Sequence, residues 1–145
     1  MRRCIATAAV ILSVAGAVTL RASEPLKAVV SSYLEMHAQL AGDKIDGVPA
    51  AAERIAVQAA QLPSGGAAIV KAAKALQPAG DLKAARDRFS ALSDAVIAAA
   101  QAEGWKDLEV ELGYCPMLKR FWLQKDKDVR NPYGMLTCGV IKEKS

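Results

Sequence analysis

Two short motifs near the C-terminus hold the residues best suited to chemistry. Tyr-Cys-Pro-Met occupies residues 114–117, and Met-Leu-Thr-Cys-Gly occupies residues 135–139. Each motif places a thiol and a thioether close together, and soft sulfur ligands select soft metal ions, chiefly Cu(I). Neither motif contains a carboxylate, the ligand that Mg²⁺ and Ca²⁺ prefer. The motifs suggest a soft-metal site, and its candidate ligands are Cys115, Met117, Met135, Cys138 and, from the only histidine, His37.

The same residues also fit a site without metal. Cys115 and Cys138 are separated by 22 residues, and a disulfide closing such a loop stabilises a fold by roughly 3 kcal/mol. Methionines commonly fill gaps in a core, so Met117 and Met135 have a second interpretation. A disulfide and a thiolate metal site are partly exclusive, because bonded sulfurs cannot ligate copper. Both interpretations require Cys115 and Cys138 to lie close together.

His37 lies on an apolar helical stripe, and such stripes are buried. A buried neutral imidazole needs a hydrogen-bond partner or a metal. We therefore expect His37 to face the C-terminal tail, where a backbone carbonyl or the thiols would meet it. No nucleophile–base arrangement can be assembled around this single histidine, and no pair of carboxylates stands out. The sequence thus predicts a protein that is not an enzyme.

The N-terminus has the pattern of a secretory signal peptide. Arg2 and Arg3 precede an uncharged apolar run from Cys4 to Leu20, and a small residue, Ala22, follows. The run is short for a membrane anchor, which needs roughly 20 apolar residues, so we predict cleavage after residues 1–22 and no stable anchor afterwards. Cleavage would lower the formal charge from +4 to +1, and no basic cluster indicates nucleic-acid binding. Export to the periplasm or beyond would place both remaining cysteines in an oxidising compartment.

Four helices are predicted before residue 104. Apolar residues recur at helical spacing from Pro25 to Gly42, and further stripes follow over about 49–62, 67–76 and 82–103. Asp81 is a suitable N-cap for the last helix, and Gly104 is suited to end it. Short connections favour antiparallel neighbours. The expected fold class is mainly α, an antiparallel four-helix bundle over residues 24–103.

The tail after Gly104 has a different pattern. Apolar residues alternate with glutamates over 108–112, which is typical of a half-exposed strand, and 135–141 is a second candidate strand. Lys119 and Arg120 are interpreted as part of a solvated turn. Five of the seven aromatic residues follow Ala102, so the tail should complete an alanine-rich core. We predict a single domain over 23–145, in which an irregular tail, 104–145, packs on the helices.

Several motifs are shared with an uncharacterised family of exported domains, found alone or fused to CusB-type periplasmic adaptor subunits of heavy-metal efflux pumps. The matching positions are Tyr33-Leu34, Arg86, Phe89, Leu92, Ser93, residues 114–117, Trp122-Leu123, Asn131-Pro132-Tyr133 and residues 135–139. The chain resembles this family over most of its length beyond residue 22. It departs from the family in two shorter loops, residues 118–121 and Gly134. The resemblance implies a helical bundle and an association with copper or related metal resistance.

Together these features predict a periplasmic, non-catalytic protein that binds a soft metal, most readily Cu(I). Its role would be sequestration or delivery to a heavy-metal efflux adaptor or another periplasmic metal carrier. The alternative is a structural or interaction module with a Cys115–Cys138 disulfide and no metal.

Overall fold

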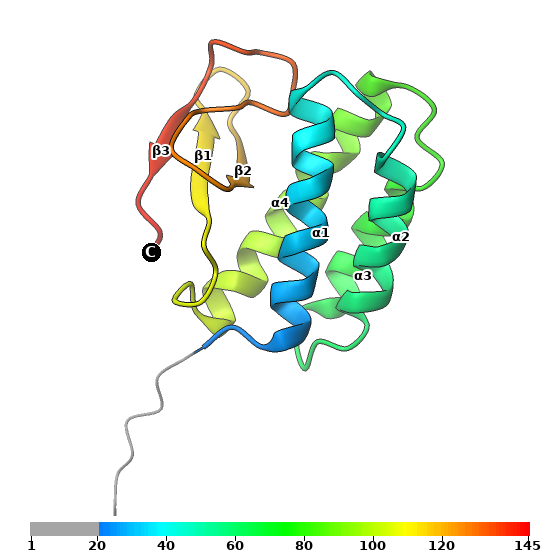
Figure 1. Cartoon of the computed structure of the whole chain (residues 1–145), viewed down its shortest axis with the longest axis vertical. Helices are drawn as coiled ribbons and strands as arrows, with labels where there is room; N and C mark the ends of the chain where they lie inside the picture. The colour runs from blue at the N-terminus through cyan, green and yellow to red at the C-terminus, as the bar shows by residue number, and fades with distance from the viewer. Residues whose placement is uncertain (1–20) are drawn as a thin grey trace, which may run out of the picture.

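A computed structural model describes residues 21–145 and contains four helices. They are α1 (Glu24–Ala41), α2 (Val48–Ala59), α3 (Gly66–Leu76) and α4 (Leu82–Glu103). Helices that follow one another along the chain pack side by side, and α1 also contacts α4 (Figure 1). The prediction of a mainly helical fold is confirmed. The predicted signal peptide, residues 1–22, lies almost entirely outside the described residues.

Side-chain capping groups mark the N-termini of α1 and α4. The Asp81 carboxylate accepts a hydrogen bond from the Ala84 amide at 2.8 Å, and the Ser23 hydroxyl accepts one from the Leu26 amide at 3.3 Å. These contacts satisfy first-turn amides that have no partner within the helix. Gly104 ends α4 with φ of 108°, a conformation that a side chain would strain. Asp81 and Gly104 therefore predicted correctly where α4 begins and ends.

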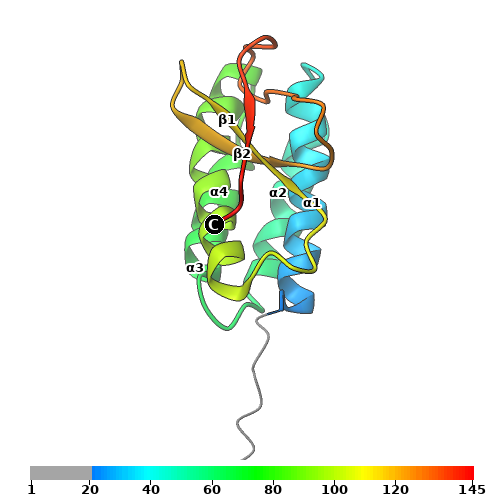
Figure 2. The ribbon, with the colours of Figure 1, turned by 90° about the vertical axis from the view of Figure 1, so that its left-hand side faces the viewer.

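The tail forms a three-stranded antiparallel sheet. Its strands are β1 (Glu111–Cys115), β2 (Arg120–Gln124) and β3 (Val140–Lys142), in the order β2-β1-β3. Figure 2 shows the β1–β2 hairpin crossing the face that α1 and α4 form, and β2 contacts both helices. Each predicted strand overlaps an observed one at its end. Of the two residues interpreted as a solvated turn, Lys119 lies in the exposed β1–β2 turn, whereas Arg120 begins β2, a strand that the sequence did not predict.

The sequence pattern of β2 explains why it was missed. Trp122, Leu123 and Gln124 are all buried: β2 contacts α1 and α4, and the Gln124 side chain is hydrogen-bonded to the chain that follows it. A strand buried on both sides has no alternation of apolar and polar residues. Its first residue, Arg120, also resembles the charged residues of an exposed turn. The tail is therefore more regular than the sequence predicts.

A row of aromatic rings joins the tail to the helices. Tyr33 of α1 stacks on Phe89 of α4 with ring centroids 4.9 Å apart, and Phe89 lies 6.0 Å from Tyr133. Tyr133 in turn meets the edge of Trp122 at 6.1 Å. Aromatic side chains bury large areas, which compensates for the small alanines of α2 and α3. As predicted, the tail completes the hydrophobic core.

Candidate functional site

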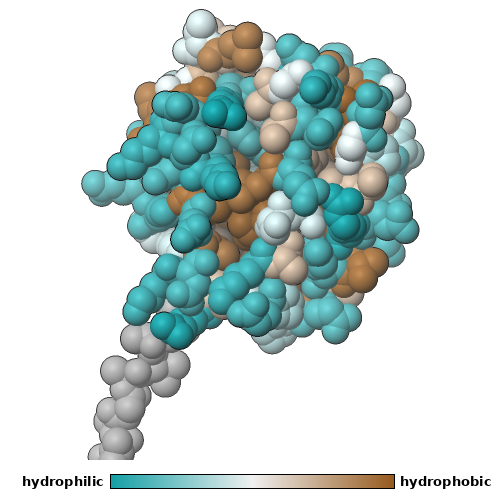
Figure 3. Space-filling view, in the orientation of Figure 1, coloured by the Kyte–Doolittle hydropathy of each residue, from teal (hydrophilic) through white to brown (hydrophobic). Residues whose placement is uncertain are grey.

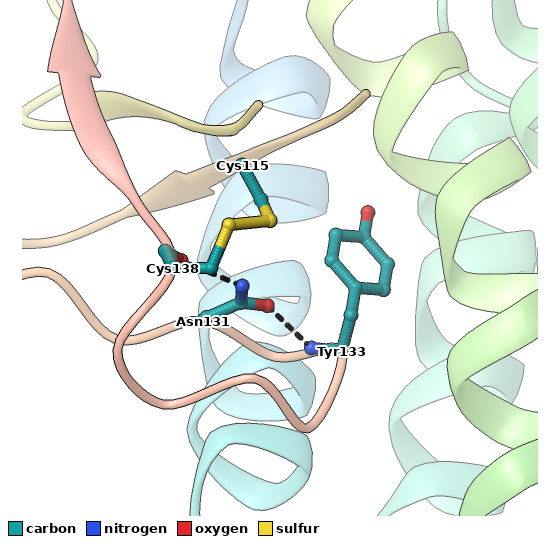
Figure 4. The surroundings of a disulfide bond; sticks show 4 residues. All are labelled: Cys115, Asn131, Tyr133 and Cys138. Atoms are coloured by element: carbon teal, nitrogen blue, oxygen red, sulfur yellow. Dashed lines mark hydrogen bonds between the residues drawn. A yellow bond between two sulfur atoms is a disulfide. The ribbon is translucent and has the colours of Figure 1, made fainter. Parts of the chain in front are cut away.

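Cys115 and Cys138 form a disulfide, with their Cα atoms 5.3 Å apart (Figure 4). Cys115 is the last residue of β1 and Cys138 precedes β3, so the bond joins the loop before β3 to the centre of the sheet. Both residues are buried, with exposed fractions of 0% and 7%. The prediction that the two cysteines lie close together is confirmed. In this structure neither sulfur is a free thiolate.

The two thioethers differ in their surroundings. Met117 lies in the β1–β2 turn and is 73% exposed, whereas Met135 is half-buried and packs against the core. Within residues 21–145, no three histidine, cysteine or acidic side chains come together in a way that could hold a metal ion. With the disulfide formed, the predicted ligands retain only thioether sulfur and the His37 imidazole. Nothing in this arrangement supports copper binding.

His37 faces the tail, as its helical stripe predicts. Its Nε2 donates a hydrogen bond to the Arg130 carbonyl at 2.8 Å, and the residue is only 5% exposed. Burial is the main cause that lowers the pKa of His37, and the carbonyl, which favours the protonated form, opposes it in part. The predicted bond to a backbone carbonyl is confirmed, and it links α1 to the chain after β2.

The burial of His37 should make the fold less stable in mild acid. An imidazole whose pKa is lower in the folded state binds more protons when unfolded, so stability falls as the pH drops below about 6.5, the value of a free imidazole. It then levels off below the folded pKa. Urea unfolding at neutral and mildly acidic pH should show a larger loss for the parent than for His37→Gln, which cannot titrate. An equal loss in both proteins would contradict this assignment.

Asn131 holds the loop that carries the second cysteine. Its side-chain amide donates to the Cys138 carbonyl at 2.7 Å, and its carbonyl oxygen accepts from the Tyr133 amide at 2.8 Å (Figure 4). The residue is fully buried, so both bonds are shielded from water. Asn131 therefore fixes the loop on both sides of Gly134. The Cys138 end of the disulfide is thus held by this hydrogen bond as well as by the bond to Cys115.

Gln124 organises the loop before Asn131. Its side-chain oxygen accepts from the Trp122 indole at 2.8 Å and from the Arg130 amide at 3.1 Å. Its side-chain nitrogen donates to the carbonyls of Asp126 and Asp128. Gln124 was not predicted from the sequence, because a glutamine beside charged residues is typical of an exposed position. The one sequence feature that could have indicated burial of Gln124 is its position directly after the Trp122-Leu123 pair.

Hydroxyl groups close the free edge of β2. The Tyr33 hydroxyl accepts from the Leu123 amide at 3.2 Å and shares a hydrogen bond with Ser93 at 2.7 Å. The Tyr133 hydroxyl donates to the Phe121 carbonyl at 2.7 Å. Edge strands otherwise present unpaired backbone groups to other chains. Burial raises the pKa of Tyr133 to about 12 and that of Tyr33 well above its ordinary value, so both remain neutral donors.

Removing the Tyr33 hydroxyl should weaken the docking of the tail. Tyr33→Phe keeps the stacked ring but leaves the Leu123 amide without a partner, and Ser93 keeps only the Tyr133 hydroxyl at 3.3 Å, at a cost of about 2 kcal/mol in unfolding free energy. Tyr114→Phe is a matched control, since that half-buried ring packs in a tilted arrangement against the exposed Phe121. Equal unfolding free energies for the two variants would show that the Tyr33 hydroxyl contributes nothing.

Arg86 of α4 joins three segments. Its guanidinium donates to the carbonyls of Leu40 and Pro132 at 2.8 and 2.9 Å, and it forms an ion pair with Asp43. The side chain is largely buried, which strengthens such charge-assisted bonds. The arrangement fixes the chain around Pro132 against α4.

The comparisons with known proteins identify no relative. No protein family, curated protein or solved structure matches the chain. Among the helices of the described residues, none is both long enough and apolar enough to span a membrane.

Proposed function

We propose that this chain is an exported, non-catalytic interaction module whose tail is held on the helices by the Cys115–Cys138 disulfide. The observation that carries the proposal is the buried disulfide itself. Structural disulfides form and persist in oxidising compartments, which agrees with the signal peptide predicted over residues 1–22. The buried polar groups around the disulfide fix the loop that carries Cys138.

The fixed tail presents side chains suited to contact with another molecule. Met117 and Leu136 are exposed on two neighbouring tail segments, the β1–β2 turn and the loop before β3. Interaction surfaces commonly use exposed methionine and aromatic side chains. The family resemblance supports a partner in the periplasm, with a heavy-metal efflux adaptor as its best candidate. That association is proposed on the motifs alone.

Cu(I) binding is the competing function. The disulfide distinguishes the two functions, because sulfurs bonded to each other cannot ligate Cu(I) as thiolates. Thiolates ligate Cu(I) strongly, while thioethers alone make a weaker site, so the oxidised protein should compete poorly with a chromogenic Cu(I) chelator. The test compares oxidised protein, protein reduced and freed of reductant, and Cys115→Ser/Cys138→Ser. We expect the oxidised protein to bind no better than the double variant. Tight binding by the oxidised protein would overturn the proposal and favour a copper carrier.

A further inference from the structure

A cavity of about 340 Å³ lies between α1 and the chain that follows β2. Leu34, Ala38 and Ala41 of α1 form its apolar side, and Gln124 to Asp126 lie opposite. Where α1 borders the tail, Figure 3 shows apolar surface between hydrophilic side chains. Ligand sites are typically hollows of this size or larger, with an apolar lining and a few polar groups. The cavity is distinct from the disulfide and from the surface around Met117.

His37 lines this cavity with one nitrogen uncommitted. Nε2 carries the proton that is donated to Arg130, so Nδ1 holds a lone pair. In the described part of the chain, the buried side-chain atoms without a partner are oxygens of Gln58 and Glu103. His37 is one of the residues that line the cavity, and its Nδ1 has no hydrogen-bond partner among residues 21–145. A ligand in the cavity would have to donate a hydrogen bond to it.

A positively charged and a negatively charged side chain line the side of the cavity opposite α1. Lys125 lines the cavity and forms no ion pair with any of residues 21–145. The neighbouring Asp126 carboxylate accepts from the Asp128 amide at 3.1 Å and lies 3.6 Å from the Arg130 guanidinium, and because it is half-exposed it retains lone pairs for a further donor. A complementary ligand carries an anionic end, a cationic donor and an apolar body. The small volume excludes a long chain.

We propose that this cavity binds a free α-amino acid with an aliphatic side chain. The ligand ammonium would meet His37 Nδ1 and Asp126, its carboxylate would meet Lys125, and its side chain would cover Leu34 and Ala38. Each polar group of the ligand then has a partner of opposite charge or a hydrogen-bond acceptor. Such partners are needed because polar groups that lose contact with water must be paired. The proposal goes beyond the proposed function, because the cavity is distinct from the disulfide and from the surface around Met117.

L-Leucine is the probe, titrated into oxidised protein with EDTA present and followed by NMR of the His37 ring and the α1 amides. We expect saturable shifts at His37 and Ala38 with a Kd of about 1 mM, as suits a small ligand. Isoamylamine lacks the carboxylate and 4-methylpentanoate lacks the ammonium group, so each should bind about tenfold more weakly. Leucine shifts that are absent, or as strong with both analogues, would overturn the site.

Two matched pairs of variants locate the binding. Ala38→Leu fills the cavity at an exposed helical position and should abolish the shifts, while Ala98→Leu, exposed on α4, should leave them unchanged. Lys125→Met should weaken binding about fivefold, and Lys127→Met in the same loop should not. Unchanged binding by Ala38→Leu would overturn the site. Intact mass of the same samples reports the disulfide, so loss of leucine binding with the disulfide present rejects only this inference.

Discussion

Replacing Cys115 and Cys138 together by alanine is expected to lower the free energy of unfolding by about 3 kcal/mol. The disulfide spans 23 positions of the chain, and its loss enlarges the ensemble of unfolded conformations. Urea unfolding followed by tryptophan fluorescence measures the change, since Trp122 is buried beside the sheet. Far-UV circular dichroism should retain most of the helical signal, because the four helices lie outside the disulfide loop.

The matched control for that variant is Met117→Leu. The side chain is 73% exposed, so its replacement should change the unfolding free energy by no more than about 0.5 kcal/mol. A double cysteine variant as stable as this control would mean that the disulfide contributes nothing to the fold. The tail would then be held by its hydrogen bonds and aromatic contacts alone.

Gly113→Ala is expected to cost a similar amount, about 3 kcal/mol, by overpacking. Gly113 lies opposite Trp122 in the β1–β2 pairing, and a Cβ atom there would stand 2.2 Å from the indole. The indole is fully buried and hydrogen-bonded to Gln124, so it cannot move aside without breaking that contact. The loss should be visible in thermal unfolding and in the fluorescence of Trp122.

Gly80→Ala is the matched glycine control. A Cβ atom at Gly80 would have nothing within 4 Å, and alanine restricts the unfolded chain, so the variant should be neutral or slightly stabilised. If Gly113→Ala were as stable as Gly80→Ala, the close approach of Trp122 to β1 would be wrong. The position of β2 against the core would then need revision.

The helices were predictable because their signals are local. Asp81 and Gly104 mark the two ends of α4 within a single periodic stripe, and no distant contact is needed to interpret them. The apolar stripe on α1 likewise predicted that the His37 side chain faces the tail. Its partner, Arg130, lies 93 positions along the chain, and no local pattern indicates which carbonyl a buried histidine meets.

The tail was less predictable because tertiary contacts define it. β2 is covered on both sides, which removes the alternation that would reveal a strand. Gln124 and Asn131 are buried polar residues whose partners are backbone groups of a folded loop, so sequence alone gives them the appearance of surface residues. The choice between disulfide and metal was also open, because both need the same two sulfurs at close range.

The most direct test of the account is the state of Cys115 and Cys138 in protein exported under its own N-terminal segment. The purified protein is denatured, treated with iodoacetamide without reductant, and weighed by intact mass spectrometry. We predict that both cysteines escape alkylation and that the mature chain weighs about two mass units less than its reduced form. Alkylation of both cysteines without prior reduction would contradict the disulfide-stabilised module and return the two thiols to a metal site.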